Sequence, residues 1–175
     1  MIRNFAKSIT QNSRNRLHLL SSPQKGTVIG WLKYSPSDFV FTAKLPKTIT
    51  HDKLIGLRDS VKTDLEGFFD VMRPLQSGGK LGCFLIQLQP KYEYNPESLK
   101  AFFNLLDPIF RYVVEFRNLS WIKPGTWDLL REHNVDFTNV DEPLLPSEVH
   151  ITTDFSYFRW YGNVLDIDWS ISQLA

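Results

Sequence analysis

Five short apolar runs lie along the chain, and most are separated by stretches in which apolar residues recur at helical spacing. The runs cover residues 39–44 (FVFTAK), 81–90 (LGCFLIQLQP), 112–118 (YVVEFRN), 135–141 (VDFTNVD) and 155–162 (FSYFRWYG). Short runs rich in β-branched and aromatic residues, bounded by polar or turn-forming residues, are typical of buried strands. The pattern therefore predicts five strands.

Three helices are predicted between these strands. Residues 51–72 carry apolar side chains near helical spacing, and Thr50 is the expected N-cap of that helix. Asn95 and Pro96 form an N-cap and first-turn signal for a second helix, and Pro124 opens a third. Strands that alternate with helices of this length are typical of parallel βα units.

The predicted fold class is therefore α/β: parallel βα units that form a partial TIM-barrel-like sheet, with about five strands of an eight-stranded barrel. A complete barrel usually takes about 250 residues, whereas the chain has 175. Residues 27–162 are assigned to this domain. Residues 1–26 are polar and receive no clear assignment, and residues 163–175 are a C-terminal tail.

Composition and charge narrow the classes of partner and the cellular compartment that we expect for this chain. With 42% hydrophobic residues the chain can bury a real core, and its net charge of +1 provides no global field that would recruit nucleic acid. No apolar run is long enough to cross a membrane or to serve as a secretory signal. The single cysteine, Cys83, cannot form an internal disulfide, so we expect a cytoplasmic protein.

Polar side chains gather where the predicted strands end. Lys44, Gln87, Glu115 with Arg117, Asp141 and Arg159 are the last polar residues of the five runs, and His51 follows the first run closely. In a parallel βα sheet the carboxyl ends of the strands meet at one edge, which is where such folds place their functional residues. We therefore expect these side chains to form one polar cluster, with Glu115 and Arg117 at its centre.

A structural interpretation stays open beside the functional one. Glu115 and Arg117 would then be a paired charge without a ligand, Trp121 a packing residue, and His51 a decoration of the first helical turn. The chain lacks the GxGxxG, Walker, CxxC, HExxH and GxSxG motifs. Cys83 lies early in its run, away from the functional edge, so we expect no thiolate nucleophile.

Several segments together resemble the domain of unknown function 72 family, the YecE-like proteins. These are WLKYSPSDFVFTAKLPKTITH, LGCFLIQLQP, VVEFRNLSW, a short VDEP and YFRWYG, in this order within residues 27–162. The resemblance implies a TIM-barrel-like fold whose biochemical function has not been established. It also implies that the characteristic polar residues of the family are Lys44, Thr50, His51, Gln87, Glu115, Arg117, Trp121, Asp141 and Arg159.

The chain also departs from the family pattern. The first two strands and the last strand of the family have no counterpart in the sequence, so it resembles a truncated or frameshifted member. Gln89 stands where the family tends to have Pro, and Tyr161 where it tends to have His. A partial barrel leaves two strand edges, expected at residues 39–44 and 155–161, so we expect the chain by itself to aggregate, oligomerise or pack loosely.

The function expected from these residues is an uncharacterised YecE-like activity on a small anionic substrate, a phosphate ester or a carboxylate. Glu115 and Asp141 are the candidate catalytic residues; the substrate-binding candidates are Lys44, His51, Gln87, Arg117, Trp121 and Arg159. The alternatives are a binding module for nucleic acid or a phosphorylated ligand, or an inactive fragment. A metal enzyme that uses His51, Glu115 and Asp141 ranks third. The sequence names no cofactor and leaves the oligomeric state open.

Overall fold

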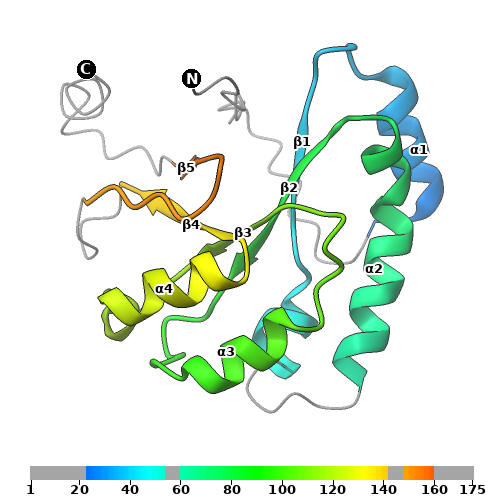
Figure 1. Ribbon diagram of the computed structural model, residues 1–175. Helices are drawn as coiled ribbons and strands as arrows, with labels where there is room; N and C mark the ends of the chain where they lie inside the picture. The colour runs from blue at the N-terminus through cyan, green and yellow to red at the C-terminus, as the bar shows by residue number, and fades with distance from the viewer. Residues whose placement is uncertain (1–22, 54–59, 142–147, 160–175) are drawn as a thin grey trace.

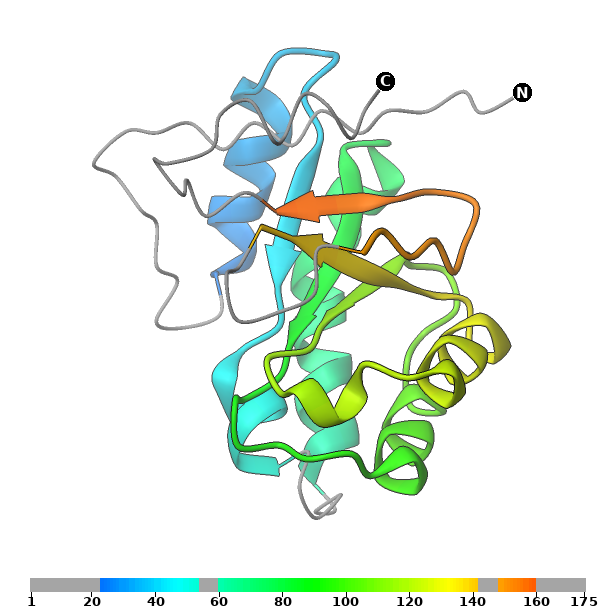
Figure 2. The ribbon, with the colours of Figure 1, turned by 90° about the vertical axis from the view of Figure 1, so that its left-hand side faces the viewer.

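Five parallel strands form one curled sheet, and helices cover its outer face (Figure 1). The computed structural model describes residues 23–53, 60–141 and 148–159. The strands follow one another in the order of the sequence: β1 (Phe41–Lys44), β2 (Leu81–Gln87), β3 (Tyr112–Glu115), β4 (Val135–Val140) and β5 (Tyr157–Arg159). Figure 2 shows them turning from upright at β1 to crosswise at β5, so that the sheet closes into half of a barrel.

The prediction of an α/β fold with five parallel strands is confirmed. Strands β1 and β5, which lie within the runs expected to form the edges, are the two edges of the described sheet. Aggregation or oligomerisation at these edges stays a prediction. The polar segment 1–22 and residues 160–175 lie outside the described residues, and the second range includes Tyr161, the position where the family tends to have His.

Apart from α1, which precedes β1, the helices lie between the strands, with small differences from expectation. They are α1 (Lys25–Tyr34), the π-helical turn η1 (Thr48–Lys53), α2 (Ser60–Ser77), α3 (Pro96–Phe103), the 3₁₀ turn η3 (Leu119–Trp121) and α4 (Pro124–Glu132). The starts predicted for α3 and α4 are confirmed, and the Asn95 side chain accepts a hydrogen bond from the Ser98 N–H at 3.1 Å.

Two details of the helix prediction are wrong. No helix was predicted at residues 25–34, because α1 has only a weak separation of apolar and polar faces and buries Val28 alone. Thr50 is not an N-cap: it lies inside η1, where its hydroxyl donates to the Pro46 carbonyl at 3.4 Å. The helix expected from residue 51 is described as η1 and α2, with residues 54–59 outside the described part of the chain.

A left-handed glycine ends α2 and aims the chain into β2. Gly79 has a φ of +68°, which glycine adopts at little cost. The Lys80 N–H returns to the Leu75 carbonyl at 2.8 Å, and the Gly79 N–H to Gln76 at 3.0 Å, the pattern of a Schellman cap. The Lys80 ammonium then donates to the carbonyls of Leu32 and Ser35, which fixes the end of α1 beside the start of β2.

Alternation along the strands separates a large outer core from a small inner one. Phe84 and Ile86 of β2 point to the helices, where Phe84 meets the rings of Phe68, Phe69, Phe110 and Tyr112. On the opposite, concave face a second cluster consists of Cys83, Leu85 and Val113, packed against Phe155 and Tyr157. The last inward positions of β2 and β3 are therefore polar while their outward neighbours remain apolar.

A buried carboxyl group attaches the short β5 to the sheet. Asp136 of β4 is fully buried and accepts a hydrogen bond from the Tyr157 N–H at 2.9 Å. The hydroxyl of Thr152 donates to the Val135 carbonyl at 2.8 Å and accepts from the Phe137 N–H at 3.1 Å. Because β5 has only three residues, these contacts supplement its few ladder hydrogen bonds.

The first prediction concerns the outer core. Phe84 is 0% exposed and touches four other aromatic rings, so Phe84→Ala should lower the free energy of unfolding by about 3–5 kcal/mol. Ile109 is 53% exposed, and Ile109→Ala should change it by less than about 1 kcal/mol. Urea unfolding of both variants measures the difference, and equal losses would contradict this core.

The second prediction concerns Asp136 and pH. Burial raises the pKa of Asp136 from 3.8 to about 6, against its hydrogen bonds, which lower it. The folded protein thus binds a proton that the unfolded chain releases, and the resulting stability is present at low pH and lost as pH rises through about 6. The free energy of unfolding of the wild type, minus that of Asp136→Asn, should increase by roughly 2 kcal/mol from about pH 7 to about pH 4. A difference that stays constant with pH would show that the carboxyl group titrates alike in both states.

Candidate functional site

A chain of hydrogen bonds joins four strands at their carboxyl ends. The Lys44 ammonium donates to Oε1 of Gln87, and Nε2 of Gln87 donates to Oε1 of Glu115 at 2.6 Å. Nη1 of Arg159 donates to the other oxygen of Glu115, Oε2, also at 2.6 Å. We call these four residues, from β1, β2, β3 and β5, the strand-end cluster.

Sheet register explains why these side chains meet. Gln87 pairs with Glu115 and Val140 pairs with Arg159, while Lys44 pairs with Leu85, two residues before Gln87. Residues two apart on a strand share a face, so each member of the cluster is the last inward-facing side chain of its strand. The stagger between neighbouring strands brings these ends to one level inside the curl.

Burial makes the pairing of Glu115 obligatory. Its side chain is 1% exposed and Gln87 is also buried, whereas the Arg159 side chain is 31% exposed. A buried carboxylate without partners costs several kcal/mol, and here both oxygens receive a donor. The guanidinium of Arg159 is therefore fixed on the buried Glu115, while part of the Arg159 side chain stays exposed.

Positive charge surrounds Lys44. Its half-buried position lowers the pKa of the Lys44 ammonium, and the guanidinium of Arg159 lowers it further; Lys47 and Arg117 act in the same direction, while Glu115 raises it. Four cations and one carboxylate thus interact at this edge, where a ligand with negative charge would relieve their repulsion.

The structure brings the other predicted residues to the same edge with different roles. Arg117 lies beyond the end of β3 with an exposed side chain and still acts on Lys44. Asp141 follows β4, and its backbone N–H donates to the Arg159 carbonyl at 3.4 Å. His51 lies in η1, with Nδ1 2.8 Å from the Thr50 hydroxyl.

Trp121, a candidate for substrate binding, is a packing residue in the structure, which was the alternative interpretation. It is 0% exposed, and its Nε1 donates to the Tyr92 carbonyl at 2.9 Å. Its ring stacks on Phe116 at 4.7 Å between centroids, on the helix side of the sheet. Trp121 thus holds the residue that directly follows Glu115, from the face opposite to the strand-end cluster.

Two residues near the cluster were not among the predicted site residues. Lys47, three residues beyond Lys44, acts on it electrostatically, and Nε2 of Gln89 donates to the His51 carbonyl at 2.6 Å. Gln89 thereby fixes η1 over the end of β2. Its spacing of two from Gln87 was a usable signal, whereas nothing in the sequence indicated what it would bind.

Cys83 has no features of a nucleophile. It is buried in the inner core, and burial raises the pKa of its thiol to about 12. A thiol of this kind is a poor source of thiolate, in agreement with the prediction. Among the described residues no group of three or more His, Cys, Asp or Glu side chains could hold a metal ion, so the third-ranked proposal gains no support.

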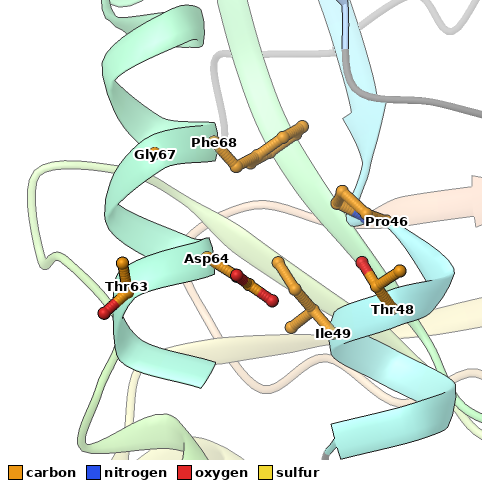
Figure 3. Close-up of a pocket in the computed structure, with 7 residues that line it drawn as sticks. All are labelled: Pro46, Thr48, Ile49, Thr63, Asp64, Gly67 and Phe68. Atoms are coloured by element: carbon orange, nitrogen blue, oxygen red, sulfur yellow. The ribbon is translucent and has the colours of Figure 1, made fainter. Parts of the chain in front are cut away.

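A separate groove lies between η1 and α2. It has a volume of about 520 Å³ and is lined by Pro46, Thr48, Ile49, Thr63, Asp64, Gly67 and Phe68. Figure 3 shows Asp64 of α2 facing Thr48 and Ile49 of η1 across it. None of the lining residues belongs to the strand-end cluster.

In the part of the chain that the structure describes, no helix combines the length and apolar character needed to cross a membrane.

Comparison with known proteins identifies the family. A family described as "Protein of unknown function DUF72" matches residues 20–172. The chain belongs to the DUF72 family. The match covers all four residues of the strand-end cluster, and it confirms the family to which the sequence motifs pointed.

Curated and solved DUF72 relatives extend beyond this chain. The UPF0759 protein YecE of Escherichia coli O157:H7 is 26% identical over 132 residues, which are 74% of this chain and 46% of that protein. A solved DUF72 protein of Thermotoga maritima has a TM-score of 0.72 at 31% identity, covering 86% of this chain and 58% of that one. A solved DUF72 protein of Enterococcus faecalis also has a TM-score of 0.72, at 24% identity, covering 86% and 62%.

The chain thus spans about half the length of the curated relatives it matches. These names assign no reaction, so the function of the family is unknown and the chemistry has to be argued from the site.

Proposed function

We propose that the strand-end cluster binds a small anionic ligand, either a phosphate ester or a carboxylate. The observation that carries the proposal is the charge around Lys44, where Arg159, Lys47 and Arg117 are offset by Glu115. Several cations at the carboxyl ends of parallel strands repel one another until an anion joins them. This edge of a βα sheet is also where such folds bind their ligands.

Each cation has a distinct place in this proposal. Arg159 is oriented by Glu115, and Lys44 by Gln87, so both present preformed donors. Arg117 and Lys47 are exposed and would contact the outer part of the ligand. A guanidinium can bind phosphate or carboxylate oxygens through two parallel hydrogen bonds, which suits Arg117 and Arg159 to orient the ligand.

If the site is catalytic, Glu115 is the acid–base group and Asp141 its second carboxylate. Glu115 is buried at the centre of the cluster, where water is scarce and proton transfer to a held ligand would be directional. We place the protein in the cytoplasm in this proposal, because its single cysteine is a buried free thiol.

The second candidate is a binding module for a phosphorylated ligand or nucleic acid that performs no chemistry. The observation in its favour is that both oxygens of Glu115 already accept hydrogen bonds, from Gln87 and Arg159. These contacts give Glu115 a structural role that accounts for its burial without any proton transfer. The same cations serve both candidates.

The third prediction tests the anion site. Phosphate at about ten times its Kd should add about 1.4 kcal/mol of stability, which raises the Tm by about 3–6 °C in a chain of this size. Arg117→Ala should reduce this gain. Arg117 is exposed, so the substitution removes a ligand contact with little effect on packing. Thermal unfolding in phosphate and in sodium chloride of equal ionic strength measures it.

The matched control is Lys62→Ala, which removes an exposed cation on α2, away from the cluster. It should keep the full phosphate gain. A Tm that rises equally in both salts, or a gain that both variants lose equally, would contradict a specific anion site.

The fourth prediction separates an enzyme from a binder. Glu115→Gln keeps the size of the side chain and removes its acid–base function, so turnover of an active phosphate ester should fall by about 10²–10⁴-fold. The phosphate-dependent rise in Tm should remain in part, because Arg117 and Lys47 keep their charges although Arg159 loses the carboxylate that orients it. Glu66→Gln on the exposed face of α2 should keep full turnover. If the wild type turns over no ester in a panel of phosphorylated metabolites yet shows the phosphate gain, the binding module is the better description.

A further inference from the structure

We propose that Lys44 is a nucleophilic amine that forms an imine with the carbonyl group of an anionic aldehyde or ketone, such as a 2-oxo acid or a phosphorylated sugar. The choice of an anionic substrate rests on the proposed function, whereas the reactivity of the amine does not. The argument uses the position of Lys44, its hydrogen-bond partner and the charges around it.

The amine of Lys44 is partly buried and lies at the carboxyl edge of the sheet, where a ligand can reach it. It is the last residue of β1 and shares the inward face with Thr42, while Leu45 beyond it is buried. The side chain is half-buried, so the chain of methylenes is held and the nitrogen lies in the strand-end cluster. A reactive lysine needs this combination, since an exposed ammonium is fully hydrated and a sealed one meets no substrate.

The hydrogen-bond partner of Lys44 does not hold it as a cation. Its nitrogen donates to Oε1 of Gln87, a neutral amide oxygen that a neutral amine can satisfy equally well. The nearby carboxylate of Glu115 is engaged by Gln87 and Arg159. Gln87 thus stands between the amine and the one group that would stabilise the ammonium most strongly.

The charges that act on Lys44 come from the ends of β1, β3 and β5. Arg159 on β5, Lys47 after β1 and Arg117 after β3 disfavour a further positive charge, and Glu115 on β3 opposes them. Together with burial, which is the largest influence, they lower the pKa of Lys44 below its usual 10.5. A lysine that is desolvated and lies beside other cations is an activated nucleophile.

The proposed step balances without a further reactant. The neutral Lys44 amine attacks the carbonyl carbon, and a C–N bond forms as the oxygen takes a proton. The carbinolamine then loses this oxygen as water, whose two hydrogens are the two that left the nitrogen, and a C=N bond remains. The proton passes from nitrogen to oxygen within the adduct or through solvent, because Gln87 separates the amine from Glu115. No electron acceptor or donor is consumed.

The test is reductive trapping of the imine in the full chain. The protein is incubated with pyruvate and sodium cyanoborohydride near pH 7.5, and the modified lysine is located by peptide mass spectrometry. Lys44 should be modified faster than Lys62, an exposed lysine of α2, because burial lowers the pKa of Lys44 and so raises its fraction of neutral amine. Lys44→Arg should abolish the adduct, and Lys62→Arg should leave it unchanged.

A pH profile gives a second measurement that does not depend on a variant. The trapping rate at Lys44 should reach its half-maximum at a lower pH than the rate at Lys62. Adducts spread evenly over the lysines, or equal pH profiles for these two residues, would overturn the proposal.

Two further outcomes separate this proposal from the anion site. Propionaldehyde is a neutral and intrinsically more reactive probe, so its trapping is compared with that of pyruvate at Lys44 and at the exposed Lys62. The same propionaldehyde-to-pyruvate ratio at both lysines would overturn the anionic substrate while leaving the amine chemistry in place. A phosphate-dependent rise in Tm without any trapping at Lys44 would overturn the imine and leave the anion site intact.

Discussion

The buried carboxylate of Glu115 is the constraint on which the site depends. A charge at 1% exposure is tolerated only when it is paired, and its two partners come from different strands. Gln87 reaches it along the β2–β3 ladder, and Arg159 reaches it from β5. The position of the edge strand β5 is therefore coupled to the polar cluster, and the loss of one partner would disturb both.

The curl of the sheet gives its two faces different tasks. The outer face packs against α2, α3 and α4 and carries most of the apolar burial, so it accounts for most of the stability. The inner face holds a small apolar cluster and then becomes polar, with Asp136 below and Glu115 at the strand ends. Buried carboxyl groups lower stability at neutral pH unless partners offset them, so a conformation that retains two of them relies on the outer core.

Membership in the DUF72 family supplies a fold and leaves the chemistry open. The charges at the strand ends lie within the matched residues and favour an anionic ligand. The neutral hydrogen-bond partner of Lys44, Gln87, supports the proposed imine formation, which anion binding alone would not require. Binding and amine chemistry make separate demands on the same lysine, because binding uses its positive charge whereas imine formation needs it uncharged. A lysine that titrates nearer to neutral pH can satisfy both in turn.

The sequence by itself determined the strands, their parallel order, the starts of α3 and α4, and the inward face shared by Val113 and Glu115, since these follow from local periodicity and capping. It also named all four members of the strand-end cluster, because a polar residue that ends an apolar run is visible in the sequence. Only the tertiary structure decided which charges pair. Arg117, two residues from Glu115, was the expected partner, yet the observed one is Arg159 of β5, 44 residues away. The stagger of the curled strands sets that contact, and no local pattern encodes stagger.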